Sequence, residues 1–138
     1  MKITRTADAS WKGSGKEGSG SLSTESGILE DTQYHFKSRF EDGNGTNPEE
    51  LLGASHAGCY TMQLSFLLNE AGYTADELNT SAKVTLEDKE ISLVALSLEG
   101  KVPEISDSKF KEIAEKAKQV CPISKVLNAN ITLEFNLK

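Results

Sequence analysis

One segment, residues 48–70, limits the possible folds more than any other part of the chain. It reads PEELLGASHAGCYTMQLSFLLNE and is mostly apolar. Asn47 can act as the N-cap, Pro48 suits the first helical position, and Glu50 stands where a capping box has its acidic residue. Gly72 follows as a helix terminator. The segment is predicted to be one helix roughly 34 Å long, enough to span a small domain.

The apolar side chains of this helix are not confined to one face. One stripe has three- and four-residue spacing and comprises Leu52, Ser55, Cys59, Met62 and Phe66. Several further leucines lie at other angles around the helix axis. The helix is therefore expected to be buried on more than one side.

The segments before the helix have the pattern of strands. Residues 3–11 and 22–29 flank a Gly/Ser-rich loop and predict a hairpin. Apolar and polar residues then alternate over 34–40, which predicts a further half-buried strand with Arg39 on its polar face.

The segments after the helix predict a hairpin within 78–102, a second helix over 106–120, a short helical turn within 121–128 and a final strand over 131–138. This order, with short connections, favours an α+β fold with antiparallel sheets around a long central helix. A length of 138 residues suits one domain covering residues 1–138.

Composition narrows the classes of partner. Charged residues make up 26% of the chain and the net charge is −6. An acidic protein is poorly suited to nucleic acid or to an anionic membrane surface, so small molecules or other proteins are the expected partners. The N-terminus has no apolar signal region, and no window resembles a membrane span, so a cytoplasmic protein is expected.

The glycine-rich stretch GSGKEG at residues 13–18 matches the G-x-G-x-x-G pattern of dinucleotide-binding turns. In that setting a helix must follow the glycines and point at the phosphates. No helical pattern follows here, so a hairpin loop is the favoured interpretation.

A structural zinc site is an alternative role for the cysteines and histidines. His56 and Cys59 are three residues apart on the predicted helix, and Cys121 and His35 could complete four ligands. The last two lie on separate elements without ligand spacing. His56 is more simply explained as a hydrogen-bonded helix residue.

Cys59 can be a packing residue or a reactive thiol. It lies in the middle of an apolar helix, where burial without a neighbouring cation raises the pKa of a thiol and makes it inert. A reactive Cys59 needs a cation from elsewhere, and Arg39 is a candidate because its guanidinium can face a thiolate and pair with a carboxylate. Glu49 and Glu50 are equally suited to stabilising the helix N-terminus.

Cys121 differs from Cys59 in its local setting. It precedes Pro122 at an expected helix start, where backbone N–H groups favour an anion. If the two cysteines meet, one can reduce a peroxide and become a sulfenic acid, and the other can condense with it to a disulfide. Spacing in the sequence does not establish that they meet.

Three stretches together resemble the OsmC/Ohr family, the osmotically inducible protein C and organic hydroperoxide resistance proteins. They are residues 9–27 (ASWKGSGKEGSGSLSTESG), residues 39–72, which contain GTNPEEL and Cys59, and residues 120–138, which contain the Cys121-Pro122 pair. The detail is closer to the OsmC branch. Tyr60 stands where phenylalanine is expected, a departure that would change the wall of the pocket.

The resemblance implies an intertwined α+β homodimer with active sites at the subunit interface. It also implies a thiol-dependent peroxidase that reduces organic hydroperoxides with no metal or other cofactor, and is reduced in turn by a thiol or a dihydrolipoyl group. On this resemblance Cys59 is the peroxidatic cysteine and Cys121 the resolving one. Arg39 would stabilise the thiolate and polarise the peroxide, and Glu49 would hold Arg39.

A function of another class stays open at this point. The chain could be a non-enzymatic binding protein that holds an apolar ligand at a dimer interface, with both cysteines as packing residues.

Overall fold

The computed structural model describes all residues from Met1 to Lys138. The chain divides into two compact units, an N-terminal unit of residues 1–51 and a C-terminal unit of residues 52–138. Helix α2 (Pro48–Glu70) begins in the first unit and continues into the second. Each unit is described on its own below.

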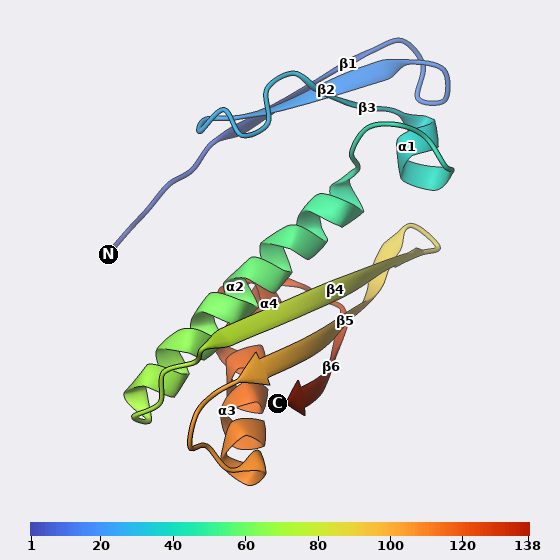
Figure 1. The fold of residues 1–138 in the computed structure, drawn as a ribbon. Helices are drawn as coiled ribbons and strands as arrows, with labels where there is room; N and C mark the ends of the chain where they lie inside the picture. The colour runs from blue at the N-terminus through green and yellow to red at the C-terminus, as the bar shows by residue number, and fades with distance from the viewer. The chain divides into compact units, whose positions relative to one another are not determined.

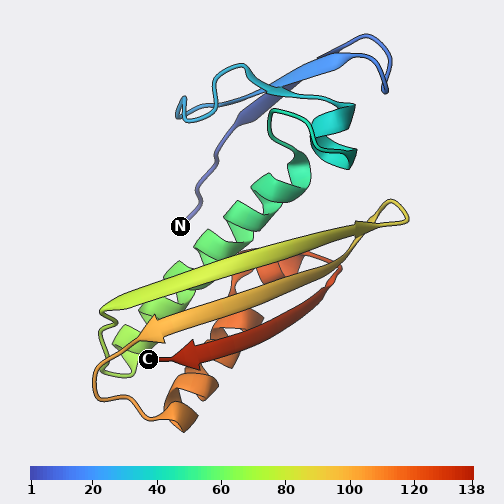
Figure 2. The same cartoon turned by 45° about the vertical axis from the view of Figure 1, so that its right-hand side comes forward.

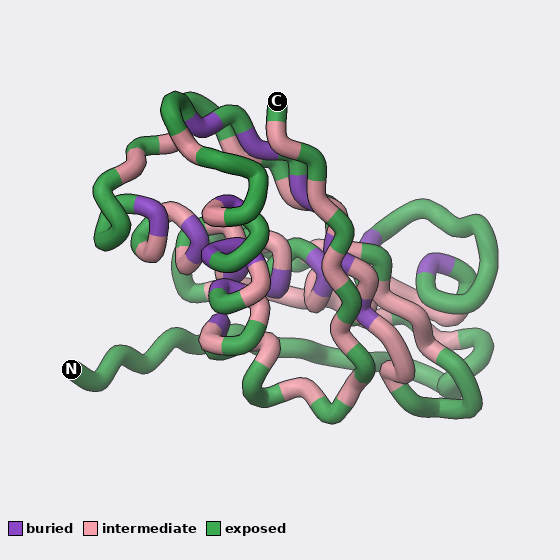
Figure 3. The backbone as a smooth tube through the Cα atoms, turned by 90° about the horizontal axis from the view of Figure 1, so that it is seen from below, coloured by how far each residue is buried: buried purple, intermediate pink, exposed green.

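The N-terminal unit contains an antiparallel sheet in the order β1-β2-β3 (Figure 1). Its strands are β1 (Ala7–Lys12), β2 (Ser19–Thr24) and β3 (Thr32–Tyr34). Strands β1 and β2 pair in antiparallel register, so the predicted hairpin is confirmed. Strand β1 is solvent-exposed along its whole length, and the segment that leads to it from the N-terminus is exposed too, coloured green in Figure 3.

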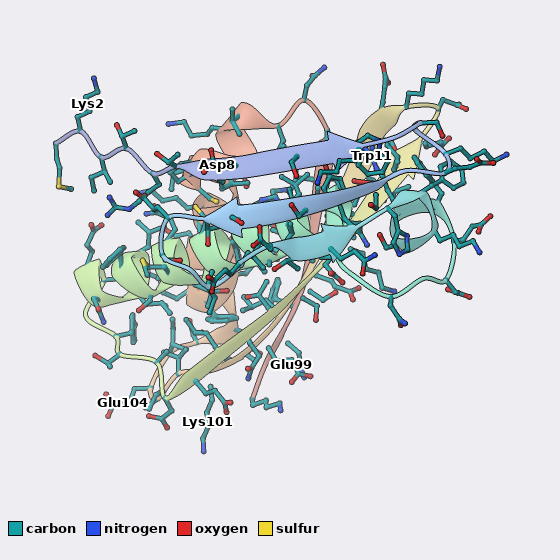
Figure 4. The ribbon with its side chains drawn as sticks, turned by 90° about the horizontal axis from the view of Figure 1, so that it is seen from above. Lys2, Asp8, Trp11, Glu99, Lys101 and Glu104 are labelled. Atoms are coloured by element: carbon teal, nitrogen blue, oxygen red, sulfur yellow. The ribbon has the colours of Figure 1, made fainter.

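The glycine-rich stretch is the loop that joins β1 to β2. Gly18 donates its N–H to the Ser14 carbonyl at 2.8 Å, and the indole N–H of Trp11 donates to the same carbonyl at 3.1 Å. Trp11, labelled on β1 in Figure 4, also lies against Tyr34 of β3, with ring centroids 5.3 Å apart. The loop is thus closed by its own hydrogen bonds, and the hairpin interpretation of this motif is confirmed.

The strand predicted over residues 34–40 is wrong. After the short strand β3 the chain forms the one-turn helix α1 (Phe36–Phe40), which carries Arg39. A reciprocal capping box starts this helix, because Ser38 N–H donates to His35 Nδ1 at 3.0 Å and His35 N–H donates to Ser38 Oγ at 2.9 Å. These local side-chain hydrogen bonds stabilise a helical turn, although apolar and polar residues alternate as in a strand. The segment is too short to show the period of a helix in its sequence.

The start and end of α2 agree with the sequence. Asn47 is the N-cap, since its Oδ1 accepts the Glu50 N–H at 2.7 Å. The Glu50 carboxylate accepts instead from the Thr46 hydroxyl at 2.7 Å, rather than closing a capping box on Asn47. The helix ends at Glu70, and Gly72 follows in the left-handed region with φ of 93°.

The C-terminal unit contains a second sheet, in the order β4-β5-β6 (Figure 2). Strands β4 (Glu77–Glu87) and β5 (Glu90–Lys101) form the predicted antiparallel hairpin. Its turn places Asp88 and Lys89 at positive φ, as a tight hairpin turn requires. Strand β6 (Asn130–Leu137) pairs with β5 in parallel, so this sheet is mixed.

Helix α3 (Asp107–Val120) and the short helix α4 (Pro122–Val126) provide the crossover between β5 and β6. In both views α2 and α3 lie on one face of the sheet (Figures 1 and 2). The core of the unit lies between these helices and the inward side chains of β5, and its buried members include Leu64, Leu68, Val94, Leu96, Leu98, Phe110 and Ile113. No helix in the structure is both long and apolar enough to cross a membrane.

The buried stripe of α2 differs from the one expected. It consists of Gly53, His56, Tyr60, Leu64 and Leu68. Met62 and Phe66, which belong to the predicted stripe, are 63% and 57% exposed. The apolar residues of α2 therefore lie on two faces, one buried in the core and one open. They are spread more widely around the helix axis than the face that packs on this sheet.

Candidate active site

Cys59 and Cys121 meet inside the C-terminal unit. Cys59 lies in the middle of α2 and is half-buried, whereas Cys121 is buried at the junction of α3 and α4. Both cysteines are free, and Cys121 Sγ donates to Cys59 Sγ at 3.0 Å. The fold has joined two thiols that are 62 residues apart in the chain.

The surroundings of Cys59 mostly favour its protonated form. Burial raises the pKa of the Cys59 thiol, and the neighbouring Cys121 thiol raises it further. A backbone N–H, that of Ile123, bonds to the Cys59 sulfur and lowers this pKa. None of these influences is a cation, so a thiolate at Cys59 requires positive charge from outside this set of neighbours.

The Ile123 N–H also refines the expectation for the start of α4. The sequence predicted that backbone N–H groups beside Pro122 would favour an anion at Cys121. In the structure Cys121 is the N-cap of α4, yet the N–H of Ile123 bonds to Cys59. The N-terminal end of α4 therefore acts on the cysteine of the other helix.

Arg39 and Glu49 form an ion pair inside the N-terminal unit. Arg39 Nε lies 2.8 Å from Glu49 Oε1, and the two side chains are 39% and 13% exposed. Asn47 supports the pair, because its Nδ2 donates to the Ser38 carbonyl at 3.0 Å and so joins the loop before α2 to α1. The structure thus brings Arg39 of α1 to the first turn of α2.

The two neighbouring glutamates have different partners. Glu49 pairs with Arg39, whereas the carboxylate of Glu50 accepts from the Thr46 hydroxyl. Helical patterning did not distinguish these residues, and the resemblance to the family pointed to Glu49. The ion pair agrees with that selection.

The four candidate zinc ligands do not form a cluster. His56 is fully buried, and its Nε2 lies 2.7 Å from Ser124 Oγ. His35 uses Nδ1 to cap α1. No group of three or more His, Cys, Asp or Glu side chains with the geometry of a metal site is present. His56 is a hydrogen-bonded helix residue, as the sequence favoured.

Two contacts near the thiols involve side chains that the sequence analysis missed or misplaced. Ser124 was missed, although it follows Cys121 by three residues just as His56 precedes Cys59 by three. Tyr60 was expected in a pocket wall, but it is fully buried in the core and its hydroxyl donates to the Ala114 carbonyl of α3 at 3.0 Å.

The arrangement of the two thiols can support dithiol–disulfide chemistry. A disulfide bond is about 2 Å long, so the sulfur atoms need to approach by only about 1 Å from their contact distance. The class of site is therefore a potential redox-active cysteine pair, carried by a helix centre and a helix junction.

Comparison with known proteins identifies the family. A family model described as OsmC-like protein matches residues 41–136. The Escherichia coli (strain K12) protein named Peroxiredoxin OsmC is 47% identical over 142 residues, covering 100% of this chain and 99% of that protein. The chain belongs to the OsmC family.

More distant relatives carry Ohr names and share the fold. Organic hydroperoxide resistance protein OhrB of Bacillus subtilis (strain 168) is 23% identical over 121 residues, covering 86% of this chain and 89% of that protein. The crystal structure of an organic hydroperoxide resistance protein from Elizabethkingia anophelis matches with a TM-score of 0.71 at 23% identity, covering 100% of both chains. An OsmC-like protein from Mycoplasma pneumoniae matches with a TM-score of 0.72 at 16% identity, covering 99% of both. The predicted α+β fold class is confirmed.

Proposed function

We propose that the protein is a thiol-dependent peroxidase that reduces organic hydroperoxides to alcohols. The observation that carries this proposal is the 3.0 Å contact between the free thiols of Cys59 and Cys121. Membership of the OsmC family and the peroxiredoxin and hydroperoxide-resistance names of its relatives support a peroxidase role.

The reaction has two steps at these cysteines. The Cys59 thiolate attacks one peroxide oxygen, the O–O bond breaks, and the alkoxide takes a proton and leaves as an alcohol, so that Cys59 becomes a sulfenic acid. The Cys121 sulfur then attacks the Cys59 sulfur and expels water, which forms the Cys59–Cys121 disulfide. An external thiol or a dihydrolipoyl group reduces the disulfide and completes the cycle.

The proposed role of Arg39 is to supply the positive charge that the neighbours of Cys59 do not provide. Burial disfavours a thiolate at Cys59, and a guanidinium is a permanent positive charge that would offset this cost. The pair with Glu49 uses Nε, and the guanidinium has four further N–H donors for a thiolate or a peroxide oxygen. Glu49 would fix the orientation of Arg39.

Organic hydroperoxides are the proposed substrates because of the apolar side chains around Cys59. Cys59 packs against the apolar core of the C-terminal unit, and so does Ile123, whose backbone N–H bonds to the Cys59 sulfur. An alkyl group gains free energy when it leaves water for such surroundings, about 25 cal/mol per Å² of buried surface, and hydrogen peroxide has no apolar surface to bury.

The homodimer is part of the proposal. Met62 and Phe66 are large apolar residues on an open face of α2, and a second copy of the chain would cover them. In this proposal residues 1–138 form one OsmC-like domain, completed in an intertwined dimer in the cytoplasm. A Phe66→Glu variant should lower the dimer fraction in sedimentation analysis, whereas a Lys83→Glu control, at an exposed position of β4, should not.

The decisive experiment is a peroxide titration of the reduced protein with thiol counting. With a dithiol as reductant, cumene hydroperoxide should be consumed much faster than H₂O₂, and each chain should lose two thiols without intermolecular crosslinks. Cys59→Ser should abolish consumption, while Cys121→Ser should leave a sulfenic acid at Cys59 that a nucleophilic probe can trap. Retention of both thiols under excess hydroperoxide would instead favour the non-enzymatic binding protein.

A further inference from the structure

A second contact joins the two segments that carry the cysteines. His56 and Cys59 lie three residues apart on α2, and Ser124 lies three residues after Cys121 at the start of α4. His56 Nε2 and Ser124 Oγ are 2.7 Å apart, beside the 3.0 Å contact of the two sulfur atoms. The two contacts join α2 to the segment of α4 in antiparallel order, because His56 precedes Cys59 whereas Ser124, the partner of His56, follows Cys121.

The α4 segment has few other attachments. It is a helix of five residues without a buried member, and the side chain of its N-cap residue, Cys121, makes no capping hydrogen bond. Ile123 and Leu127 are only partly buried where they pack on the core, and Val126 is 73% exposed. Apart from the Ile123 N–H that bonds to the Cys59 sulfur, the polar link from α4 to a buried side chain is the contact of Ser124 with His56, so this contact has a large share in setting where α4 lies relative to α2.

The chemistry of His56 suits a fixed link rather than proton transfer. Its side chain is fully buried, and Nδ1 has no hydrogen-bond partner. Burial lowers the pKa of His56, which keeps the imidazole neutral near pH 7. A proton on Nδ1 would be a buried N–H donor without an acceptor, so the neutral ring carries its proton on Nε2. The Nε2–H then donates to Ser124 Oγ.

We propose that His56 is a positioning residue that, through Ser124, holds the α4 segment so that Cys121 stays within attacking distance of Cys59. This inference rests on the proposed function, because it concerns the step in which the Cys59 sulfenic acid condenses with Cys121. Removing the link widens the range of positions open to Cys121 and slows this closure.

The test measures the closure step alone. Reduced wild-type protein and Ser124→Ala are each mixed with one equivalent of cumene hydroperoxide, and the decay of the sulfenic acid is followed with a trapping probe at timed intervals. Loss of one hydrogen bond predicts closure about three- to tenfold slower in Ser124→Ala. Ser124→Thr, which keeps the hydroxyl, should restore the rate to near that of the wild type.

Tyr60→Phe is the matched control. Tyr60 follows Cys59 directly, and its buried hydroxyl bond runs to Ala114 in α3 and not to α4. This variant also loses a buried hydrogen bond of α2 but should close its disulfide at the wild-type rate. Equal slowing in Tyr60→Phe and Ser124→Ala, or no rescue by Ser124→Thr, would show general loosening and overturn the positioning role.

A second readout separates this inference from the peroxidase proposal. Ellman's reagent first forms a mixed disulfide at Cys59 with release of one thionitrobenzoate, and attack by Cys121 then releases the second as the disulfide closes. Slower second release in Ser124→Ala supports the positioning role even if the wild type consumes no hydroperoxide, a result that would reject only the peroxidase proposal. Equal second-release rates in an active wild type and in Ser124→Ala would reject only the positioning role.

Discussion

Arg39 Nε lies 2.8 Å from Oε1 of Glu49, and this ion pair joins the one-turn helix α1 to the first turn of α2. The carboxylate is the better shielded partner, with 13% of its side chain exposed against 39% for the arginine. Glu49 is thus a fixed acceptor, while part of the guanidinium faces outward, where it can meet another anion.

The first prediction concerns Arg39. Arg39→Ala should raise the pKa of the Cys59 thiol, because it removes the cation proposed to offset the burial of the thiolate. Less thiolate and a less polarised peroxide together should slow hydroperoxide reduction by about a hundredfold. The ultraviolet absorbance of the thiolate, followed against pH, measures the first effect. Lys37→Ala, which removes an exposed cation from the same short helix, serves as control. An unchanged titration in Arg39→Ala would count against the assigned role.

The second prediction separates positioning from stability at Glu49. Glu49→Gln keeps the size of the side chain but removes the charge that holds Arg39, so kcat/KM should fall by about tenfold. The free energy of unfolding should change by less than about 1 kcal/mol, because the arginine partner is partly exposed to water. Glu50→Gln is the control, since Glu50 accepts from Thr46 instead. Equal activity losses in both variants would contradict a specific role for Glu49.

Long, regular elements of the fold could be predicted from the sequence. The N-cap at Asn47, the helix from Pro48 to Glu70 and the β4–β5 hairpin all leave strong local signals. Helix α1 could not be predicted in this way, because one turn held by the His35–Ser38 capping box carries no readable period. The parallel pairing of β6 with β5 was also missed, since strand direction depends on the path of α3 and α4.

The candidate site shows the same limit. The types of residue could be read from the sequence, but their contacts depend on tertiary packing. The Cys59–Cys121 contact joins positions 62 residues apart, and the His56–Ser124 contact joins positions 68 residues apart. The buried face of α2 was misjudged because a helix with apolar residues all round does not reveal which side its own sheet covers.

The third prediction concerns acid stability and His56. Its pKa is lowered by burial, so the unfolded chain binds a proton below about pH 6.5 before the folded protein does. The contribution of the buried neutral His56 to the stability of the fold is complete above the pKa that His56 has in the unfolded chain. It is lost as the pH falls from there toward the lower pKa of the folded protein. Between pH 7 and pH 5 the free energy of unfolding, measured with denaturant, should therefore fall more steeply in the wild type than in His56→Gln. The two slopes should differ by at most about 1.4 kcal/mol per pH unit. Parallel profiles for the two proteins would contradict this expectation.

The fourth prediction concerns Tyr60, whose hydroxyl donates to the Ala114 carbonyl inside the core. Burial, followed by the charges of Glu115 and Cys121, raises the pKa of Tyr60 above its ordinary value of 10.0. Above about pH 10 the unfolded chain releases this proton while the folded protein retains it, so stability falls as the pH rises.

The difference in stability between the wild type and Tyr60→Phe should depend on pH. At pH 7 it should be less stable than the wild type by about 1 kcal/mol, because one buried hydrogen bond is lost. Above pH 10 the wild type alone has the Tyr60 proton to lose, so the difference in unfolding free energy should shrink with rising pH. Chemical denaturation at several pH values measures both effects, and the other tyrosines cancel because both proteins contain them. A difference that stayed constant up to pH 11 would mean that Tyr60 ionises as readily in the folded protein as in the unfolded chain, contrary to its burial against α3.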